Sequence, residues 1–222
     1  LLSISHELRT PLTAVRGYGE AMTDGLVKEA DIAGVGATLV AETERLDRFV
    51  ADLLELARLE ADDFVIHPQP VELEGLLAEV QHAWHGRSAT LGVTIEVDSG
   101  VTSVTTDGRR LRQVIDGLVE NALRVSPAGS TVTVTISANG HDQVDIVVTD
   151  GGPGLSDDDL SVAFDRGVLR DRYRDERPVG TGLGLSIASR LVQRLGGTIL
   201  ASNAPGAGAR FTVRLPAAAG GS

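Results

Sequence analysis

The residues most able to do chemistry lie in two glycine-rich segments. The first, 150–154, follows a run of β-branched residues and contains Asp150, Gly152 and Gly154. The second, 180–185, precedes a helical pattern and begins with Gly180, Thr181, Gly182, Leu183 and Gly184. Glycine allows close backbone approach, and free N–H groups at a helix N-terminus bind phosphate oxygens. The second segment therefore indicates a phosphate clamp, with a tight turn as the alternative, and it matches neither a P-loop nor the Rossmann spacing.

Two further features, one between these segments and one before them, could bind the same phosphate-containing ligand. Residues 164–179 carry five arginines and four acidic residues with almost no apolar periodicity. A stretch of this length inside a compact domain is usually either a functional lid or a solvated loop. Asn121 lies in a predicted helix whose other residues have the pattern of a buried core helix. Its amide oxygen is either solvated or a ligand for Mg²⁺, which prefers oxygen donors and keeps water and phosphate partners.

His6 is a candidate nucleophile near the N-terminus. It falls on the side of a helical pattern that faces away from the apolar stripe. A neutral imidazole in that place is either a competent nucleophile near neutral pH or simply an exposed histidine. A zincin site is excluded because Thr10 stands where a second histidine is needed. His82 and His85 are spaced i, i+3, but no further His or Cys lies nearby, which favours a solvated helix face.

Helical periodicity dominates the first 62 residues. One helix runs to about residue 23 with Pro11 as a local kink, and a turn is expected over residues 25–36. The pattern of residues 31–61 repeats apolar side chains in steps of four and three, like a coiled-coil seam. Two helices alone bury too little surface, so we expect this hairpin to dimerise into a four-helix bundle.

Helix and strand signals alternate after a proline-containing linker at residues 63–70. Helices are expected over 73–84, 107–124 and 183–195, with a short one from 157, and strands over 93–97, 101–105, 131–137, 144–149, 198–201 and 210–215. This order predicts an α/β sandwich over residues 71–216, one sheet covered by helices, and a disordered tail at 217–222. The whole chain is therefore expected to be of the α+β class.

Composition excludes several classes of protein. The 222 residues include 20 Lys+Arg and 31 Asp+Glu, and the net charge is −11. This balance and an aromatic share of 3% argue against a nucleic-acid partner, because phosphate backbones recruit positive surface and bases stack on aromatic rings. The absence of Cys excludes disulfides and Cys-ligated metals. No apolar run of 18 residues and no signal peptide is present, and the start at Leu1 leads us to expect a piece of a longer protein.

Taken together, the motifs resemble those of sensor histidine kinases of two-component systems. Residues 5–12, SHELRTPL, resemble the H-box, and residues 120–124, ENALR, resemble the core of the N-box. The two glycine-rich segments resemble the first and second glycine boxes, and residues 206–211 resemble a degenerate third. All five occur in the family's order and at family-like spacing, and the resemblance covers the chain from residue 1 to about residue 216.

This resemblance implies different roles for the two parts of the chain. Residues 1–62 would form the dimerisation and histidine-phosphotransfer hairpin of a homodimer, and residues 71–216 would form the catalytic ATP-binding domain of the gyrase and histidine kinase type. His6 would accept the γ-phosphoryl group, Glu7 would act as base, and Thr10 would orient water for dephosphorylating the partner. The partner would be the receiver domain of a response regulator. The chain would be the cytoplasmic portion of a parent anchored in the plasma membrane through segments outside this sequence.

In the ATP-binding domain the resemblance implies roles for the polar and glycine residues named above. Asp150 would accept the adenine amino group, while Gly152 and Gly154 would let the base approach. Asn121 would bind Mg²⁺. The residues expected near the phosphates of ATP are Arg124, the lid residue Arg166, Gly180, Thr181, Gly182, Leu183 and Gly184.

Two positions depart from the family pattern. Gly117 stands where many relatives carry an additional Asn, and Val125 stands where an aromatic residue usually follows the basic one. Two functions therefore stay open. One is a histidine autokinase that passes its phosphoryl group to a response-regulator aspartate and also dephosphorylates it. The other is a catalytically weak or non-catalytic dimeric nucleotide-binding scaffold. A gyrase- or chaperone-type ATPase, the third reading, would lack the H-box hairpin.

Overall fold

The computed structural model describes residues 2–61, 63–140, 142–173 and 179–217, with side chains from Leu8 onward. The chain divides into two compact units, Leu1–Glu55 and Leu56–Ser222. The expected tail at 217–222 lies outside the described residues except for Ala217. Among the described helices, none combines the length and apolar character needed to cross a membrane.

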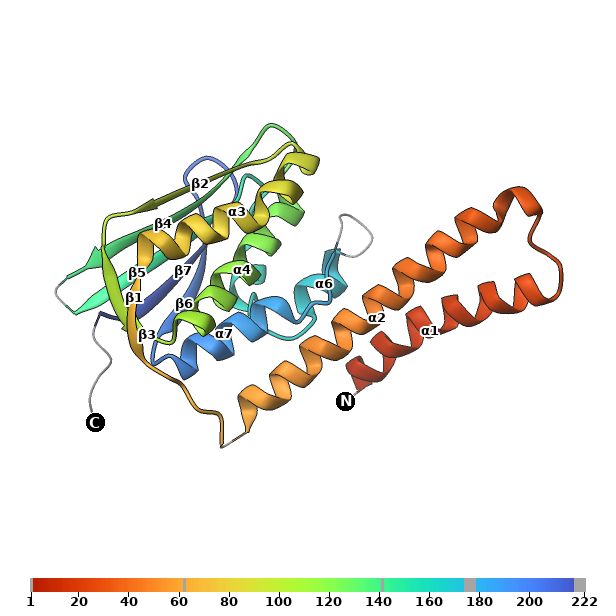
Figure 1. The fold of residues 1–222 in the computed structure, drawn as a ribbon, viewed down its shortest axis with the longest axis horizontal. Helices are drawn as coiled ribbons and strands as arrows, with labels where there is room; N and C mark the ends of the chain where they lie inside the picture. Colours follow the sequence, from red (N-terminus) through yellow and green to blue (C-terminus); the bar gives the residue numbers. More distant parts are fainter. Residues whose placement is uncertain (1, 62, 141, 174–178, 218–222) are drawn as a thin grey trace. The chain divides into compact units, whose positions relative to one another are not determined.

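The first unit is a helical hairpin, which confirms the expected class for this part of the chain (Figure 1). Helix α1 (Leu2–Thr23) contains Pro11, and a short 3₁₀ turn η1 (Glu29–Asp31) leads into α2 (Ile32–Glu60). The turn is shorter than expected, because Gly34 and Gly36 are helical. Each helical glycine costs about 1 kcal/mol relative to alanine, so Gly34 and Gly36 weaken the first turns of α2.

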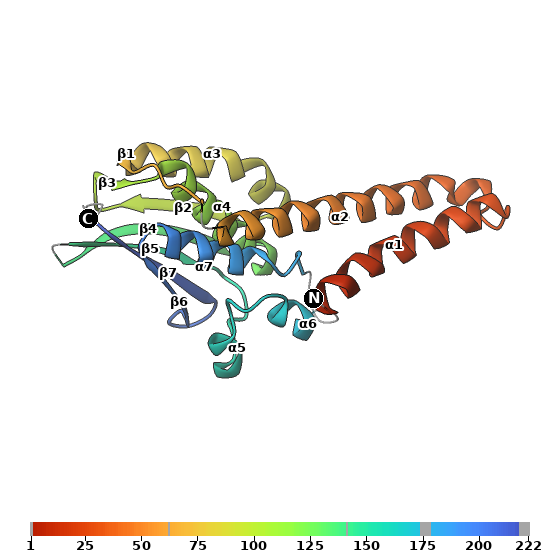
Figure 2. The same ribbon diagram turned by 90° about the horizontal axis from the view of Figure 1, so that it is seen from below.

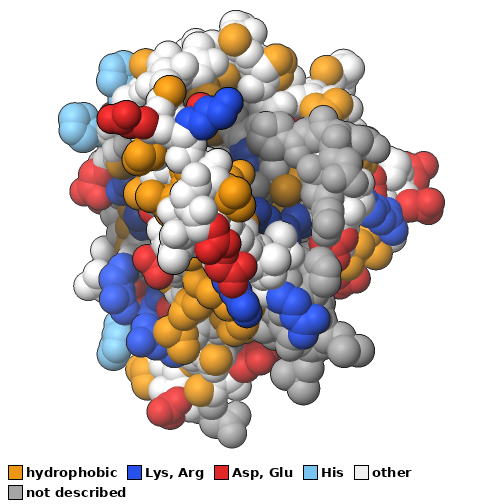
Figure 3. Space-filling model, turned by 90° about the vertical axis from the view of Figure 1, so that its right-hand side faces the viewer, with side chains coloured by type: hydrophobic (Ala, Val, Ile, Leu, Met, Phe, Trp, Pro, Cys, Tyr) orange, Lys and Arg blue, Asp and Glu red, His pale blue; other side chains and the backbone are white. Residues whose placement is uncertain are grey.

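Many apolar side chains of the hairpin remain at its surface. Figure 3 shows orange side chains among charged ones on the face that it draws. Phe49 is buried, but large apolar side chains along both helices are exposed: Leu12, Tyr18, Met22, Ile32, Val40, Val50 and Leu54. The hairpin as it stands therefore leaves these apolar side chains in contact with water.

The second unit is built on a mixed five-stranded sheet. Its strand order is β2-β4-β5-β7-β6, in which β2 and β4 are parallel and all other pairs are antiparallel. The strands are β2 (Thr94–Ser99), β4 (Thr131–Asn139), β5 (Gln143–Thr149), β6 (Thr198–Asn203) and β7 (Ala209–Pro216). A small second sheet pairs β1 (Gln69–Glu72) with β3 (Ser103–Thr106). Strand β1 begins inside the segment expected as a linker.

Three helices cover one face of the five-stranded sheet: α3 (Leu73–Leu91), α4 (Gly108–Val125) and α7 (Gly184–Arg194) (Figures 1 and 2). Strands β4, β5 and β7 alternate buried and accessible residues, so one face of each strand forms the core. Helix α4 begins where the sequence predicts, because the Asp107 carboxylate caps it by accepting from the Arg110 backbone N–H at 3.1 Å. These elements confirm the α/β sandwich.

The segment expected as a lid contains a helix that its composition does not reveal. Helix α5 (Asp157–Ser161) begins near the expected position, and α6 (Val168–Tyr173) follows inside residues 164–179. Tyr173 and Arg172 both donate hydrogen bonds to the Asp159 carboxylate. This tertiary contact holds α6 although its sequence has no apolar period. Residues 174–178 of the expected lid lie outside the described part of the chain.

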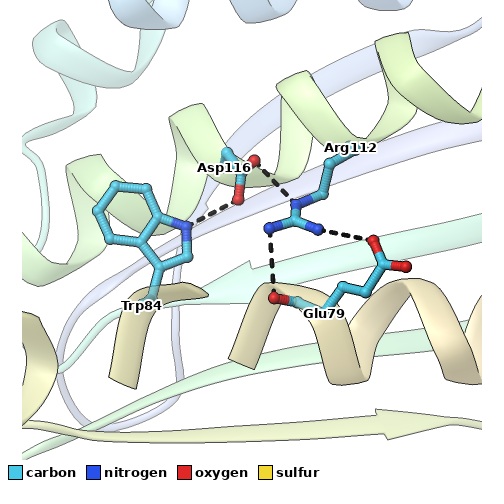
Figure 4. Close-up of polar contacts among 4 residues, drawn as sticks. All are labelled: Glu79, Trp84, Arg112 and Asp116. Carbon is cyan, nitrogen blue, oxygen red and sulfur yellow. Dashed lines mark hydrogen bonds and ion pairs between the residues drawn. The ribbon is translucent and has the colours of Figure 1, made fainter. Parts of the chain in front are cut away.

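Helices α3 and α4 are joined by a polar network (Figure 4). The Trp84 indole Nε1 donates to Asp116 Oδ1 at 2.7 Å, and Arg112 Nε donates to Asp116 Oδ2 at 2.8 Å. The Arg112 guanidinium also reaches the Glu79 carboxylate at 3.2 Å and the Glu79 carbonyl at 3.3 Å. Because α4 carries Asn121 and Arg124, the network fixes the helix that supplies these side chains.

The last turn of α2 belongs to the second unit. Arg194 donates from Nε to the Leu59 carbonyl at 2.8 Å and from a terminal nitrogen to the Ala61 carbonyl at 2.7 Å. These bonds satisfy carbonyls that a helix end leaves without partners. The guanidinium carbons of Arg110 and Arg194 also lie 4.8 and 5.6 Å from the centre of the Phe64 ring. The chain entering β1 is therefore bound to α4 and α7.

Candidate functional site

Asp150 forms the buried base of the site at the end of β5. Its Oδ1 accepts from the backbone N–H of Gly152 at 2.8 Å and from that of Ala209 at 3.0 Å. The Asp150 backbone N–H in turn donates to the Ala209 carbonyl at 3.0 Å. Two donors on one oxygen fix the orientation of the carboxylate, which makes it a defined acceptor for an amino group.

Both glycines predicted beside Asp150 are required by their surroundings. A Cβ at Gly152 would lie 3.0 Å from both Cγ2 and the carbonyl oxygen of Val125. Gly154 has a φ of +78°, and a Cβ there would lie 2.8 Å from Asn203 Oδ1. Val125, which stands where relatives carry an aromatic residue, therefore supports the first glycine-rich segment directly.

The second glycine-rich segment enters α7 and contacts two arginines. A Cβ at Gly180 would lie 2.8 Å from the guanidinium carbon of Arg124. Gly182 has a φ of +80°, and a Cβ there would lie 3.0 Å from Cδ of Arg170. Thr181 Oγ1 accepts from the Leu183 backbone N–H at 3.3 Å, just before α7 begins at Gly184. The segment thus packs against the Arg124 guanidinium and the aliphatic part of Arg170, and it leads into α7, whose first N–H groups are those that a helix leaves free.

Helix α4 brings Asn121 and Arg124 to this segment. The Arg124 guanidinium lies 3.5 Å from Asn121 Oδ1 and 3.5 Å from the Glu120 carboxylate. Glu120 is also paired with Arg87 of α3 at 3.3 Å. The structure therefore brings together three predicted site residues, Asn121, Arg124 and Gly180, which the sequence separates by up to 59 positions.

The two lid arginines have different surroundings. Arg166, the predicted phosphate contact, is paired with Glu60 and is 46% exposed. Arg170 is only 7% exposed and packs against Gly182, while the Gly167 backbone N–H donates to the Gly182 carbonyl at 3.0 Å. Sequence reasoning missed Arg170 because nothing local distinguishes it from its neighbouring arginines. Its burial beside the second glycine-rich segment makes it the better placed cation.

Asp159 anchors the lid helix to α5. Its carboxylate accepts from the Tyr173 hydroxyl, from Ser156 Oγ at 2.8 Å and from Arg172. The hydrogen bond from Tyr173, with those from Ser156 and Arg172, lowers the pKa of Asp159 from 3.8 to about 2 against the effect of burial. The carboxylate is therefore ionised throughout the neutral range and holds α6, the helix within the lid segment, to α5.

The described residues of this site offer a metal ion few ligands. Within the described residues, no three His, Cys, Asp or Glu side chains are arranged to hold one. Asn121 supplies a single amide oxygen, which lies next to the Arg124 guanidinium. Mg²⁺ is commonly bound by one or two protein oxygens, with phosphate oxygens and water completing the shell. The donor set fits Mg²⁺ that arrives with a nucleotide rather than a metal in a protein cage.

The predicted phospho-acceptor segment lies in α1. The backbone of His6 and Glu7 is helical, but their side chains lie outside the described residues. Thr10 is an exposed residue of the same helix, one turn after His6. The helical spacing places Thr10 and His6 on one side of α1.

Comparison with known proteins places both units in one family. Residues 1–62 match the family model of the His Kinase A (phospho-acceptor) domain, and residues 106–219 match that of the histidine kinase-, DNA gyrase B- and HSP90-like ATPase. Sensor protein SrrB of Staphylococcus aureus (strain MRSA252) is 31% identical over 218 residues, which are 97% of this chain and 37% of SrrB. The chain thus spans just over a third of the length of this relative.

Solved structures agree with this placement. Histidine kinase AdeS of Acinetobacter baumannii is similar with a TM-score of 0.78 and 27% identity, over 96% of this chain and 98% of the AdeS chain. Full-length ShkA in complex with AMPPNP is similar with a TM-score of 0.73 and 31% identity, over 100% of this chain and 46% of the ShkA chain. With the hairpin, the α/β sandwich and the motifs in their expected order, the chain belongs to the sensor histidine kinase family.

Proposed function

We propose that this chain is the ATP-dependent autokinase portion of a sensor histidine kinase. In this proposal residues 1–62 are the dimerisation and phosphotransfer domain, and residues 71–216 are the catalytic ATP-binding domain. The observation that carries the proposal is the meeting of Asn121, Arg124 and Gly180 beside the N-terminus of α7. A guanidinium and glycine backbone N–H groups bind phosphate oxygens, and an amide oxygen binds the Mg²⁺ that accompanies a polyphosphate.

Adenine recognition is assigned to the buried Asp150. Its carboxylate, fixed by two backbone N–H groups, accepts a hydrogen bond from the amino group of the base. Gly152 and Gly154 carry no side chain and so let the ring approach the backbone. The similarity to ShkA supports a nucleotide at this site, because that structure holds AMPPNP, an ATP analogue.

The phosphates are assigned to the opposite end of the site. Arg124 packs against Gly180 and Arg170 against Gly182 of the second glycine-rich segment, and α7 begins directly after it at Gly184 with N–H groups that a helix start leaves free for phosphate oxygens. Mg²⁺, when bound through Asn121 Oδ1, would neutralise charge on the phosphate oxygens. Phosphoryl transfer has a loose transition state with charge spread over oxygens, so these fixed positive groups supply the catalysis by position and electrostatics.

The transfer itself uses the helical hairpin. A nitrogen lone pair of the neutral His6 imidazole attacks the γ-phosphorus, the bond to the β,γ-bridging oxygen breaks, and ADP leaves with that electron pair. Glu7 accepts the proton from the other ring nitrogen. The phosphoryl group then passes to an aspartate of a response-regulator receiver domain. Thr10 orients water for the later hydrolysis of that aspartyl phosphate, which releases inorganic phosphate.

Dimerisation and membrane attachment complete the proposal. The exposed apolar side chains of α1 and α2 support a homodimer through residues 1–62, since a second copy would remove them from water. The parent protein is proposed to be anchored in the plasma membrane by segments outside this sequence, with this chain on the cytoplasmic side.

Incubation with γ-labelled ATP and Mg²⁺ tests the proposed activity. We expect acid-labile, alkali-stable label on the wild type and none on His6→Gln or Asn121→Ala. Thr10→Ala should retain autophosphorylation while slowing dephosphorylation of the regulator. Undiminished label on Asn121→Ala would contradict the metal assignment.

A non-catalytic scaffold is the second candidate, and Gly117 favours it. This residue lies one turn before Asn121, and a Cβ there would meet nothing within 4 Å, so an available ligand position carries no side chain. An absence of label with ATP still bound would support the scaffold. Gly117→Asn fits the open space, and a weak kinase should gain activity from it whereas a scaffold should not.

A further inference from the structure

Strands β6 and β7 form a hairpin that contains the degenerate third glycine segment, residues 206–211. Residues 204–208 connect the two strands, and the Ala204 backbone N–H donates to the Gly208 carbonyl at 2.9 Å to close the turn. This hairpin lies against residues 150–155, the first glycine-rich segment and the residue after it.

Asn203 binds the far end of that segment at two points. Its Nδ2 donates to the Leu155 carbonyl at 2.7 Å, and its Oδ1 accepts from the Leu155 backbone N–H at 2.9 Å. The same Oδ1 occupies the space in which a Cβ of Gly154 would lie. A side-chain amide that matches both backbone groups of one residue fixes the position of that residue as another strand would.

Gly208 and Ala209 bind the near end of the segment. Gly208 has a φ of +91°, and a Cβ there would lie 1.8 Å from the Asp150 carbonyl oxygen, so only glycine allows this approach. The approach brings the Ala209 N–H to Asp150 Oδ1 at 3.0 Å. The hairpin therefore holds both the carboxylate at the start of the segment and the backbone at its end.

We propose that Asn203 is a positioning residue for adenine recognition, which keeps residues 151–155 in the one conformation that leaves Asp150 and the glycine backbone open to the base. This inference rests on the proposed role of Asp150. Between Asp150 and Leu155 the segment contains three glycines, whose backbone freedom is large. Without the two bonds from Asn203, the segment would sample many conformations, and the amino group of the base would lose its ordered acceptor.

Calorimetric titration of the full chain with two nucleotides tests this inference. One is ATP, and the other is purine riboside 5′-triphosphate, which lacks the amino group of adenine. Because two hydrogen bonds are lost, we expect Asn203→Ala to weaken ATP binding by about tenfold while changing the affinity for the analogue by less than about twofold. Asn203→Asp, which keeps only the acceptor for the Leu155 N–H, should show an intermediate loss for ATP and serves if Asn203→Ala is unstable.

Asn139→Ala provides a matched control. Asn139 is the last residue of β4 and pairs with Gln143 at the start of β5, whereas Asp150 follows the end of β5, and the Asn139 Nδ2 donates to Asp145 at 3.1 Å. We expect it to leave the preference for ATP over the analogue unchanged. A loss that is equal for both nucleotides in Asn203→Ala, or no loss at all, would overturn the positioning role.

Asp150→Asn separates this inference from the proposed function. If Asp150→Asn binds ATP as tightly as the wild type, the adenine role of Asp150 fails. If Asp150→Asn loses the preference for ATP while Asn203→Ala keeps it, the proposed function stands and the inference about Asn203 is wrong.

Discussion

Removal of the Asp116 carboxylate tests how helix α4, which carries Asn121 and Arg124, is held against α3. In Asp116→Ala the Trp84 indole N–H and the Arg112 Nε each lose an acceptor, at 2.7 and 2.8 Å (Figure 4). The side chains of Arg112 and Asp116 are 21% and 32% exposed, so solvent weakens their ion pair. The indole bond contributes about 1.5 kcal/mol and the screened pair about 0.5 kcal/mol. We expect the free energy of unfolding to fall by about 2 kcal/mol.

Thermal and urea unfolding followed by far-ultraviolet circular dichroism would measure this loss. For a unit of this size, about 2 kcal/mol lowers the melting temperature by about 4–8 °C. Trp84 is the one tryptophan of the chain, so its fluorescence independently reports the environment of the indole. Asp116→Asn should cost less than Asp116→Ala, because the amide oxygen still accepts from the indole.

A double-mutant cycle with Trp84→Phe isolates the indole contribution. We expect a coupling energy of about 1 kcal/mol between the two positions. Glu79→Gln is the control, since the Glu79 side chain is 74% exposed, and should change stability by less than about 0.5 kcal/mol. A loss below about 0.5 kcal/mol in Asp116→Ala, or no coupling with Trp84→Phe, would refute the account of α4 as held by this network.

Three further predictions concern the lid and the sheet. Arg170→Ala should weaken ATP binding about tenfold in calorimetric titration and Arg166→Ala less, and the reverse order would reassign the phosphate contact. Because the folded pKa of Asp159 is about 2 against an ordinary 3.8, its stabilisation is complete above pH 3.8 and is lost as the pH falls through 2. Asp159→Asn should therefore flatten the acid limb of an unfolding profile, and an unchanged limb would contradict this. Gly197→Ala should lower the free energy of unfolding by at least about 2 kcal/mol in urea titration, because its Cβ would lie 2.4 Å from the Arg214 carbonyl oxygen; a stable variant would show that β7 can shift.

Much of the fold follows from local sequence signals. The amphipathic period predicts α4 and α7, the β-branched runs predict β4 and β5, and Asp107 marks the start of α4 correctly. Capping and side-chain alternation act over a few residues, so they can be recognised without knowledge of the rest of the chain. The ends of the helices and strands were predicted less accurately than their existence. Strand β1 lies partly in the expected linker, and α2 begins before Gly34 and Gly36.

In the candidate site, too, local sequence signals predicted some residues and not others. Motif order and spacing identified the two glycine-rich segments, Asn121 and Asp150, and glycine itself marks where a backbone must approach closely. The sequence could not single out one arginine of the lid as the phosphate contact, because five arginines in that segment have the same local chemistry. Burial beside Gly182 distinguishes Arg170, while the ion pair with Glu60 occupies Arg166.

The ordered motifs are thus sufficient to predict the family and to propose the residues that bind a nucleotide, and periodicity is sufficient to predict the two kinds of unit. Folding alone brings Asn203 to Leu155 across 48 positions, and Ala209 to Asp150 across 59. Helix α6 likewise depends on the contact of Tyr173 with Asp159. These contacts are long-range, and their stabilisation arises only when the sheet has brought distant segments within hydrogen-bonding distance, so no window of the sequence contains the signal for them.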